Sequence, residues 1–183
     1  MTRLLIATLI ATLALPSAAL AQGAALGGVR EAARNAGQPK GAKQKVERAV
    51  LDLSAAMQTD DPQKRSEAVR KMMPVRDDLE ALFGATDGGT LFEAMQPAVE
   101  KFVAASAANP PPPFGTVEAV DVRTDRASQR LYAAVLDRIP NDVPVFRVTV
   151  RGDQRASGLS SFVVLADRVV WIRGLERAPQ ALR

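Results

Sequence analysis

Residues 143–176 are the part of the chain that most limits how the rest can fold. This segment, VPVFRVTVRGDQRASGLSSFVVLADRVVWIRGLE, is rich in β-branched residues and contains the only tryptophan, Trp171. Alternating apolar residues bounded by polar turns are typical of β-strands. The pattern therefore predicts the centre of an antiparallel sheet, with consecutive strands at 145–151, 159–165 and 169–173.

The sequence just before this segment predicts at least one further strand. Residues 116–124 (TVEAVDVRT) alternate with a period of two, as a half-buried strand does. Residues 129–139 (QRLYAAVLDRI) fit either another strand or a short helix, and the pattern leaves both open. We therefore expect a curved β-meander of four or five strands over residues 116–174.

The chain from residue 42 to residue 108 has helical periodicity instead. Val46, Val50, Leu53 and Met57 recur at spacings of four, three and four residues, which places them on one face of a helix. A second helix is predicted after Asp61-Pro62, because Asp caps helix N-termini and Pro fits the first helical position. A short third helical segment is expected within 74–84.

A longer helix is expected to follow and to cover the sheet. Gly88-Gly89 predicts a break, and Thr90 with Glu93 has the spacing of a capping box at a new helix N-terminus. An apolar stripe runs from residue 92 to residue 103, and Pro97 within it predicts a kink or a division into two helices. Residues 109–113 (NPPPP) predict a stiff, extended connection to the sheet.

The N-terminus predicts export. Arg3 precedes an uncharged apolar run, and Ala19-Leu20-Ala21 has the small-x-small form of a signal-peptide cleavage site. The run is shorter than the roughly 20 apolar residues that span a bilayer. We therefore predict a signal peptide over 1–21, cut after Ala21, and a periplasmic or secreted protein. The mature chain would comprise a flexible basic arm (22–41), one α+β domain (42–176) and a tail (177–183).

Composition excludes several kinds of chemistry. The chain has neither Cys nor His, so disulfides, thiolate metal sites and the usual partner of a serine nucleophile are excluded. Acidic residues cluster at Asp60-Asp61 and Asp77-Asp78, but their positions at helix starts favour capping over metal binding. The residues therefore indicate no catalytic group, no metal site and no cofactor.

One face of the predicted sheet is the candidate binding site. Alternation places Phe146, Val148 and Val150 on an apolar face that should pack on the helices. We expect the opposite face to gather Arg and Trp side chains, since Arg can stack on a Trp ring. Such a cationic and aromatic face could hold an anionic or planar ligand. The alternative is an ordinary solvated sheet face. The candidate ligand-binding residues are Arg147, Arg151, Trp171 and Arg173.

Helical segments followed by a meander ending in FVVLADRVVWIRGLE resemble exported bacterial α+β domains of unknown function. The order of elements over residues 42–176 is also similar to the nuclear transport factor-like and cystatin-like cone folds. That resemblance implies helices packed into a curved sheet. The Asp/His pocket of the enzymes with that fold does not carry over, because this chain has no His.

Two functions are compatible with these patterns. The first is an exported, non-catalytic domain that binds a small ligand or a partner on its sheet, with an envelope protein or a small anionic ligand as the partner. It predicts no nucleic-acid binding and no stable membrane insertion after signal cleavage. The alternative is a carboxylate-dependent enzyme with Asp121 or Asp137 inside a cone-shaped pocket.

Overall fold

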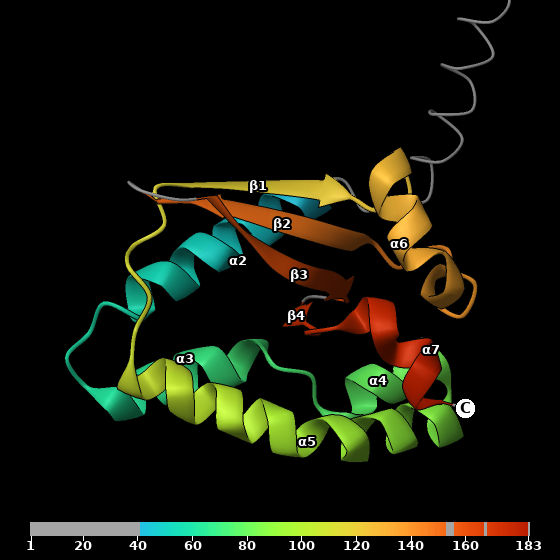
Figure 1. Ribbon diagram of the computed structural model, residues 1–183, viewed down its shortest axis with the longest axis horizontal. Helices are drawn as coiled ribbons and strands as arrows, with labels where there is room; N and C mark the ends of the chain where they lie inside the picture. The colour runs from blue at the N-terminus through green and yellow to red at the C-terminus, as the bar shows by residue number, and fades with distance from the viewer. Residues whose placement is uncertain (1–40, 153–155, 167, 183) are drawn as a thin grey trace, which may run out of the picture.

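The computed structural model describes residues 41–152, 156–166 and 168–182. Helices come first along the chain, and an antiparallel sheet of four strands in the order β1-β2-β3-β4 follows (Figure 1). The predicted α+β class and β-meander are therefore confirmed. The predicted signal peptide and nearly all of the basic arm lie outside the described residues.

The described elements follow the predicted order closely. The strands are β1 (Thr116–Asp121), β2 (Val145–Arg151), β3 (Ala156–Leu165) and β4 (Arg168–Trp171). The helices are α2 (Ala42–Ala56), α3 (Pro62–Met72), α4 (Arg76–Phe83), α5 (Ala85–Ala108), α6 (Arg126–Leu136) and α7 (Ala178–Ala181), with a 3₁₀ turn η1 (Leu175–Arg177). Among the described residues, none of these helices combines the length and the apolar character needed to span a bilayer.

The first two helices form where periodicity and capping predict them. All four residues of the predicted α2 stripe are buried: Val46, Val50, Leu53 and Met57. Asp61 caps α3, since its Oδ1 accepts hydrogen bonds from the backbone N–H groups of Gln63 (2.8 Å) and Lys64 (3.4 Å). These local signals therefore fix the helical hairpin that covers the sheet.

The predicted break at Gly88-Gly89 is wrong, because both residues lie inside the continuous helix α5. Thr90 does not cap a new helix either; its hydroxyl donates to the carbonyl oxygen of Thr86 at 2.9 Å. A Cβ at Gly88 would lie 2.5 Å from the Cα of Glu80 and would also collide with the carbonyl oxygen of Leu79. Gly88 is therefore required by the close packing of α4 on α5, and this contact outweighs the low helix propensity of glycine.

Two further expectations are settled by α5 and α6. Pro97 lies within α5 on an exposed turn, and the helix continues through it as one element.

Residues 129–139, which fitted either a strand or a helix, are largely helix α6. Asp125 caps this helix, since its Oδ2 accepts from the Ser128 N–H at 2.8 Å. The sheet consequently has one strand before β2.

The sheet has buried side chains on both faces. One face packs with α2, α3 and the C-terminal half of α5, and we call this side the α2/α3 core; it contains Val50, Leu53, Val103, Phe146, Phe162 and Trp171. The other face packs with α4, α6 and η1, and we call this side the α6 core; it contains Leu79, Leu82, Tyr132, Val163, Val170 and Ile172. Ala178, in the segment predicted to be a tail, is also buried there.

A bulge interrupts the pairing of β2 with β3. The register shifts between Phe146 and Val148, and opposite this point Ser161 has a left-handed backbone with φ of 47°. A bulge bends a strand and increases its twist. The strands twist strongly past one another in Figure 1.

Candidate functional site

The four residues predicted to share one sheet face do not do so. Trp171 pairs with Phe162, and Phe162 pairs with Phe146, so all three side chains point to the same face. That face belongs to the α2/α3 core, where Trp171 is 6% exposed. The expected cationic and aromatic face is therefore wrong, because alternation within a strand does not set the register between strands.

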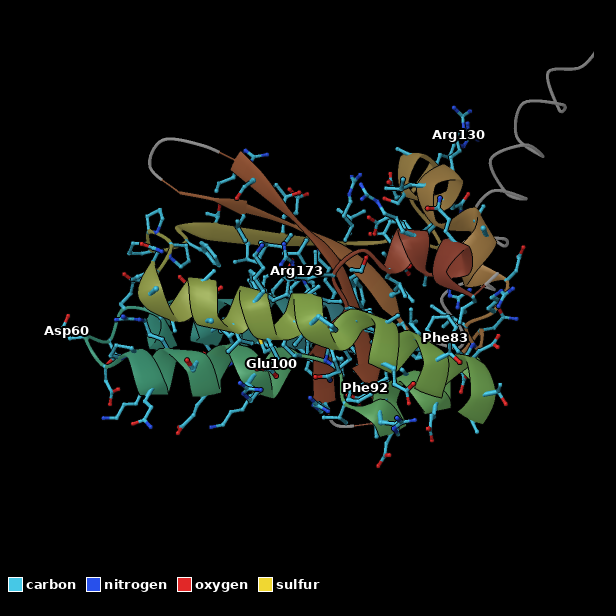
Figure 2. The ribbon with its side chains drawn as sticks, turned by 60° about the horizontal axis from the view of Figure 1, so that its bottom comes forward. Asp60, Phe83, Phe92, Glu100, Arg130 and Arg173 are labelled. Atoms are coloured by element: carbon cyan, nitrogen blue, oxygen red, sulfur yellow. The ribbon has the colours of Figure 1, made fainter. Side chains whose placement is uncertain are left out.

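The three arginines of the predicted site lie apart from one another. Arg147 lies on the opposite face from Trp171, with Nη2 3.9 Å from Asp125 Oδ2 at the start of α6. Arg151 is exposed at the end of β2. Arg173 lies just beyond β4 on the Trp171 side, and its guanidinium carbon is 3.9 Å from the centroid of the Phe102 ring. Figure 2 shows Arg173 beside α5, which carries Phe102.

Trp171 is instead part of an aromatic wall. Its ring stacks on Phe162, with centroids 5.4 Å apart and planes 13° apart. It also meets the edge of Phe102 at 5.2 Å and 87°. Both geometries are favourable for aromatic pairs. The indole is therefore fixed between β3 and α5.

This wall borders an open cavity of about 430 Å³, which we call the Trp171 cavity. It lies where α2, α3, the end of α5, the Pro-rich connection and the sheet meet. Its lining is apolar apart from three uncharged polar side chains, Ser106, Asn109 and Ser157, and no charged side chain is among the described residues that line it. The apolar lining residues are Leu53, Met57, Val69, Phe102, Ala105, Pro111, Phe114, Leu159 and Trp171.

Specific hydrogen bonds hold the Pro-rich connection against the cavity. Gln58 Nε2 donates to the Pro111 carbonyl at 3.2 Å, and the Phe114 N–H donates to Ser54 Oγ at 2.9 Å. The buried Arg65 fixes the end of α5, because its Nε donates to the Ala107 carbonyl at 2.7 Å. A cation at this position also interacts favourably with the C-terminal end of the helix dipole. The rim of the cavity is therefore anchored to α2 and α3.

Two of the four clustered acidic residues, Asp61 and Asp78, have structural partners. Asp78 Oδ2 accepts from the Val75 N–H at 2.9 Å and from Arg168 Nη1 at 2.6 Å, so Asp78, like Asp61, has the capping role that the sequence favoured. Asp60 is exposed at the connection between α2 and α3 (Figure 2). Within the described ranges, no cluster of three or more carboxylates is placed to hold a metal ion.

The carboxylates of the enzymatic alternative gain no support from their positions. Asp137 is exposed at the end of α6. Asp121 is partly buried at the end of β1, where its Oδ1 accepts from the Arg123 N–H at 2.8 Å. In the described part of the chain, neither carboxylate lines the Trp171 cavity that could hold a substrate.

A buried polar pair in the α6 core could not be recognised from the sequence. The Tyr132 hydroxyl lies 2.7 Å from Ser161 Oγ, and both residues are almost completely buried. Burial raises the pKa of Tyr132 above its ordinary value, and the hydrogen bond with Ser161 partly opposes this. The pair joins α6 to the bulge in β3, and we interpret it as a structural link between the helix and the sheet.

Comparisons with known protein families, with curated proteins and with solved structures give no match for this chain. The resemblance to cone folds therefore stays a prediction.

The Trp171 cavity was missed by sequence reasoning because its lining residues come from segments far apart in the chain. The nearest signal is the run of small residues near the end of α5, AASAAN, which leaves room beside Phe102.

Proposed function

We propose that this chain is an exported, non-catalytic domain that binds a small, uncharged apolar molecule in the Trp171 cavity. The observation that carries the proposal is the cavity itself: an open hollow of about 430 Å³ with apolar walls and three polar side chains near its rim. Small-molecule sites have volumes of about 300–1,000 Å³ and combine apolar walls with a few polar groups.

The chemistry of the lining selects the ligand class. A charged ligand would lose its hydration without gaining a partner, because the described lining residues carry no charge. Ser106, Asn109 and Ser157 offer hydroxyl and amide groups that can orient one polar end of a ligand. This ligand class replaces the anionic or planar ligand that the sequence pattern predicts on a sheet face.

The exported location and the lack of catalysis rest on the sequence. The apolar run and small-x-small signal of residues 1–21 favour export. The absence of His and Cys removes the commonest catalytic bases and nucleophiles. A carrier or sensor of an apolar compound in the cell envelope is consistent with both, and an envelope protein remains the proposed partner.

The test uses N-phenyl-1-naphthylamine, a neutral apolar dye, and the emission of Trp171, which is the only tryptophan in the chain. Binding beside Trp171 should quench its emission saturably by energy transfer to the dye. Ala105→Phe fills the mouth of the cavity and should weaken binding about tenfold, which corresponds to about 1.4 kcal/mol.

Ala104→Phe is the matched control, because Ala104 is the exposed neighbour on α5 and does not line the cavity. It should bind the dye as the wild type does, and circular dichroism should show that both variants are folded. Equal affinity of the two variants, or no saturable quenching of the wild type, would overturn the proposal.

A further inference from the structure

A second hollow lies on the other side of Leu53 from the Trp171 cavity. It has a volume of about 550 Å³ and runs between α2, α3 and the start of β4; we call it the amphipathic cleft. Its floor is apolar and its rim is charged. The floor consists of Ala49, Leu53, Ala56, Ala68, Met72 and Val169, and the rim consists of Lys45, Arg48, Asp52, Lys71 and Arg168.

The cleft exists because small side chains stand where two helices face the sheet edge. Ala49 and Ala56 are two turns apart on α2, and Ala68 faces them from α3. A larger apolar residue at any of these positions would fill the hollow. The floor thus presents apolar surface that the described residues leave uncovered.

The rim carries an excess of positive charge. Four cationic side chains line it beside a single lining carboxylate, Asp52, and one of the four, Arg168, is paired with Asp78 outside the lining. Arg48 is only loosely paired with Asp52, at 4.0 Å, and both side chains are largely exposed. Lys71 forms no ion pair within the described part of the chain.

Arg168 is the fixed member of this rim. Its guanidinium donates to Asp78 Oδ2 at 2.6 Å, to the Met73 carbonyl at 2.6 Å and to the Lys71 carbonyl at 3.2 Å. An arginine has five N–H donors, so donors remain for a ligand. Because its position is already set, little conformational entropy is lost when it binds.

We propose that the amphipathic cleft binds a single-chain anionic amphiphile. The apolar chain lies on the alanine-lined floor, and the acid headgroup, a carboxylate or a phosphate, lies among Arg48, Lys71 and Arg168. The volume is that of a small-molecule site. A flat membrane surface could not reach a concave floor between two helices. This site is distinct from the Trp171 cavity, which takes an uncharged molecule.

Isothermal titration calorimetry with decanoate, decyl phosphate and decanol, below their aggregation concentrations, tests the proposal. Decanoate and decyl phosphate should bind, the tighter of the two showing which headgroup the rim prefers, and decanol should bind at least about tenfold more weakly at this site. Arg48→Gln combined with Lys71→Gln should weaken decanoate binding about tenfold. The matched control, Lys64→Gln with Lys101→Gln, removes two exposed charges outside the cleft and should have no effect.

A steric pair locates the site. Ala56→Phe fills the floor, whereas Ala55→Phe adds the same side chain at an exposed neighbour on α2 that does not line the cleft. Only Ala56→Phe should abolish decanoate binding, and naphthylamine binding beside Trp171 should survive in both variants.

Three results would overturn this inference: equal binding of decanol and decanoate in Ala105→Phe, in which the Trp171 cavity is filled; no effect of the charge variants; or loss of decanoate binding in Ala105→Phe instead of Ala56→Phe. The last would place the amphiphile in the Trp171 cavity. The first two results leave naphthylamine binding beside Trp171 untouched, and the third would change only which charge the Trp171 cavity accepts. Failure here and failure of the proposed function are therefore distinguishable, because saturable naphthylamine quenching is measured separately.

Discussion

The two faces of the sheet differ in the side chains that cover them and in the hollows beside them. The α6 core is filled by large side chains, including Leu79, Tyr132 and Ile172, and is joined to the sheet by the buried Tyr132–Ser161 hydrogen bond. On the α2/α3 side, the helices carry alanines at several facing positions, and both hollows described above open there. Protein interiors are normally close-packed. The difference is consistent with an α6 core that supplies stability and with the binding that we propose on the α2/α3 side.

The aromatic residues show the same division of roles. Tyr132 fills space and makes an internal hydrogen bond. Trp171 and Phe102 contact each other and leave part of their surface facing the Trp171 cavity. Mutations that remove equal volume on the two sides should therefore differ in their effect on stability.

The largest expected effect compares Leu79→Ala with Leu53→Ala. Leu79 is fully buried in the α6 core, so its truncation should lower the free energy of unfolding by about 4 kcal/mol. Leu53 borders two existing hollows, and its truncation should cost about 2 kcal/mol, at the low end for such substitutions. Urea unfolding measures both, and equal losses would remove the distinction between the cores.

The next largest loss of stability is expected where α4 contacts α5. Gly88→Ala should destabilise the fold by about 3 kcal/mol, because its Cβ would collide with the backbone of Leu79 and Glu80. Gly89→Ala is the matched control: its nearest neighbour is the end of the flexible Arg76 side chain at 2.8 Å, which can move. Gly89→Ala should be neutral or stabilising by up to about 1 kcal/mol, from helix propensity. Thermal unfolding of the two variants gives the comparison.

Tyr132→Phe should have a smaller effect. It leaves the buried Ser161 hydroxyl without its partner and should cost about 1–2 kcal/mol. Tyr132→Phe combined with Ser161→Ala removes both polar groups and should recover part of that loss. If the double variant is no more stable than Tyr132→Phe, the pair does not form the link described here.

The raised pKa of Tyr132 also predicts that the stability of the fold falls at alkaline pH. Because it is the only tyrosine, the absorbance rise at 295 nm reports its ionisation alone. Burial raises its pKa in the folded protein above the ordinary value of 10.0, so the rise should occur above pH 10 while the protein is folded. The unfolded chain releases this proton first, so the contribution of the neutral phenol to stability is complete below pH 10 and is lost as the pH rises above it. Tyr132→Phe should lack that part of the pH dependence.

The smallest expected change in stability comes from removing an exposed ion pair, Arg70–Glu100, on the surface of the α2/α3 side. Arg70 donates to both carboxylate oxygens of Glu100, at 2.5 and 2.9 Å, and these hydrogen bonds lower the pKa of Glu100. The stabilising contribution of the ionised Glu100 carboxylate is therefore present at pH values above its ordinary pKa of 4.5. It is lost as the pH falls below that value. Both side chains are about half exposed, so the difference between wild type and Glu100→Gln should be small at pH 7. Glu67→Gln is the control on α3.

The parts of the fold set by local signals could be predicted from the sequence. The α2 stripe, the Asp61-Pro62 start of α3 and the three strands of residues 143–176 depend on periodicity and capping within one segment. Gly88 was misread because its role depends on α4, which no local pattern reports. The same limit explains Trp171: strand alternation was right within β4, but its pairing with Phe162 decides which core the indole enters.

The candidate site was harder to predict than the fold because a hollow forms where small side chains from separate segments meet and leave space unfilled. Ala49, Ala56 and Ala68 read as ordinary helix residues in the sequence, and only their meeting beside β4 makes a cleft. Phe102 and Phe114 belong to different segments and line one cavity only after folding.

Leu53 is the side chain that the Trp171 cavity and the amphipathic cleft have in common. A ligand that moves Leu53 as it enters one hollow reshapes the wall of the other, so two ligands bound there would be thermodynamically linked. Linkage is reciprocal: the factor by which the first changes the affinity for the second equals the factor by which the second changes the affinity for the first. Through Leu53, the concentration of an apolar compound in the Trp171 cavity would then control the release of a charged amphiphile from the amphipathic cleft.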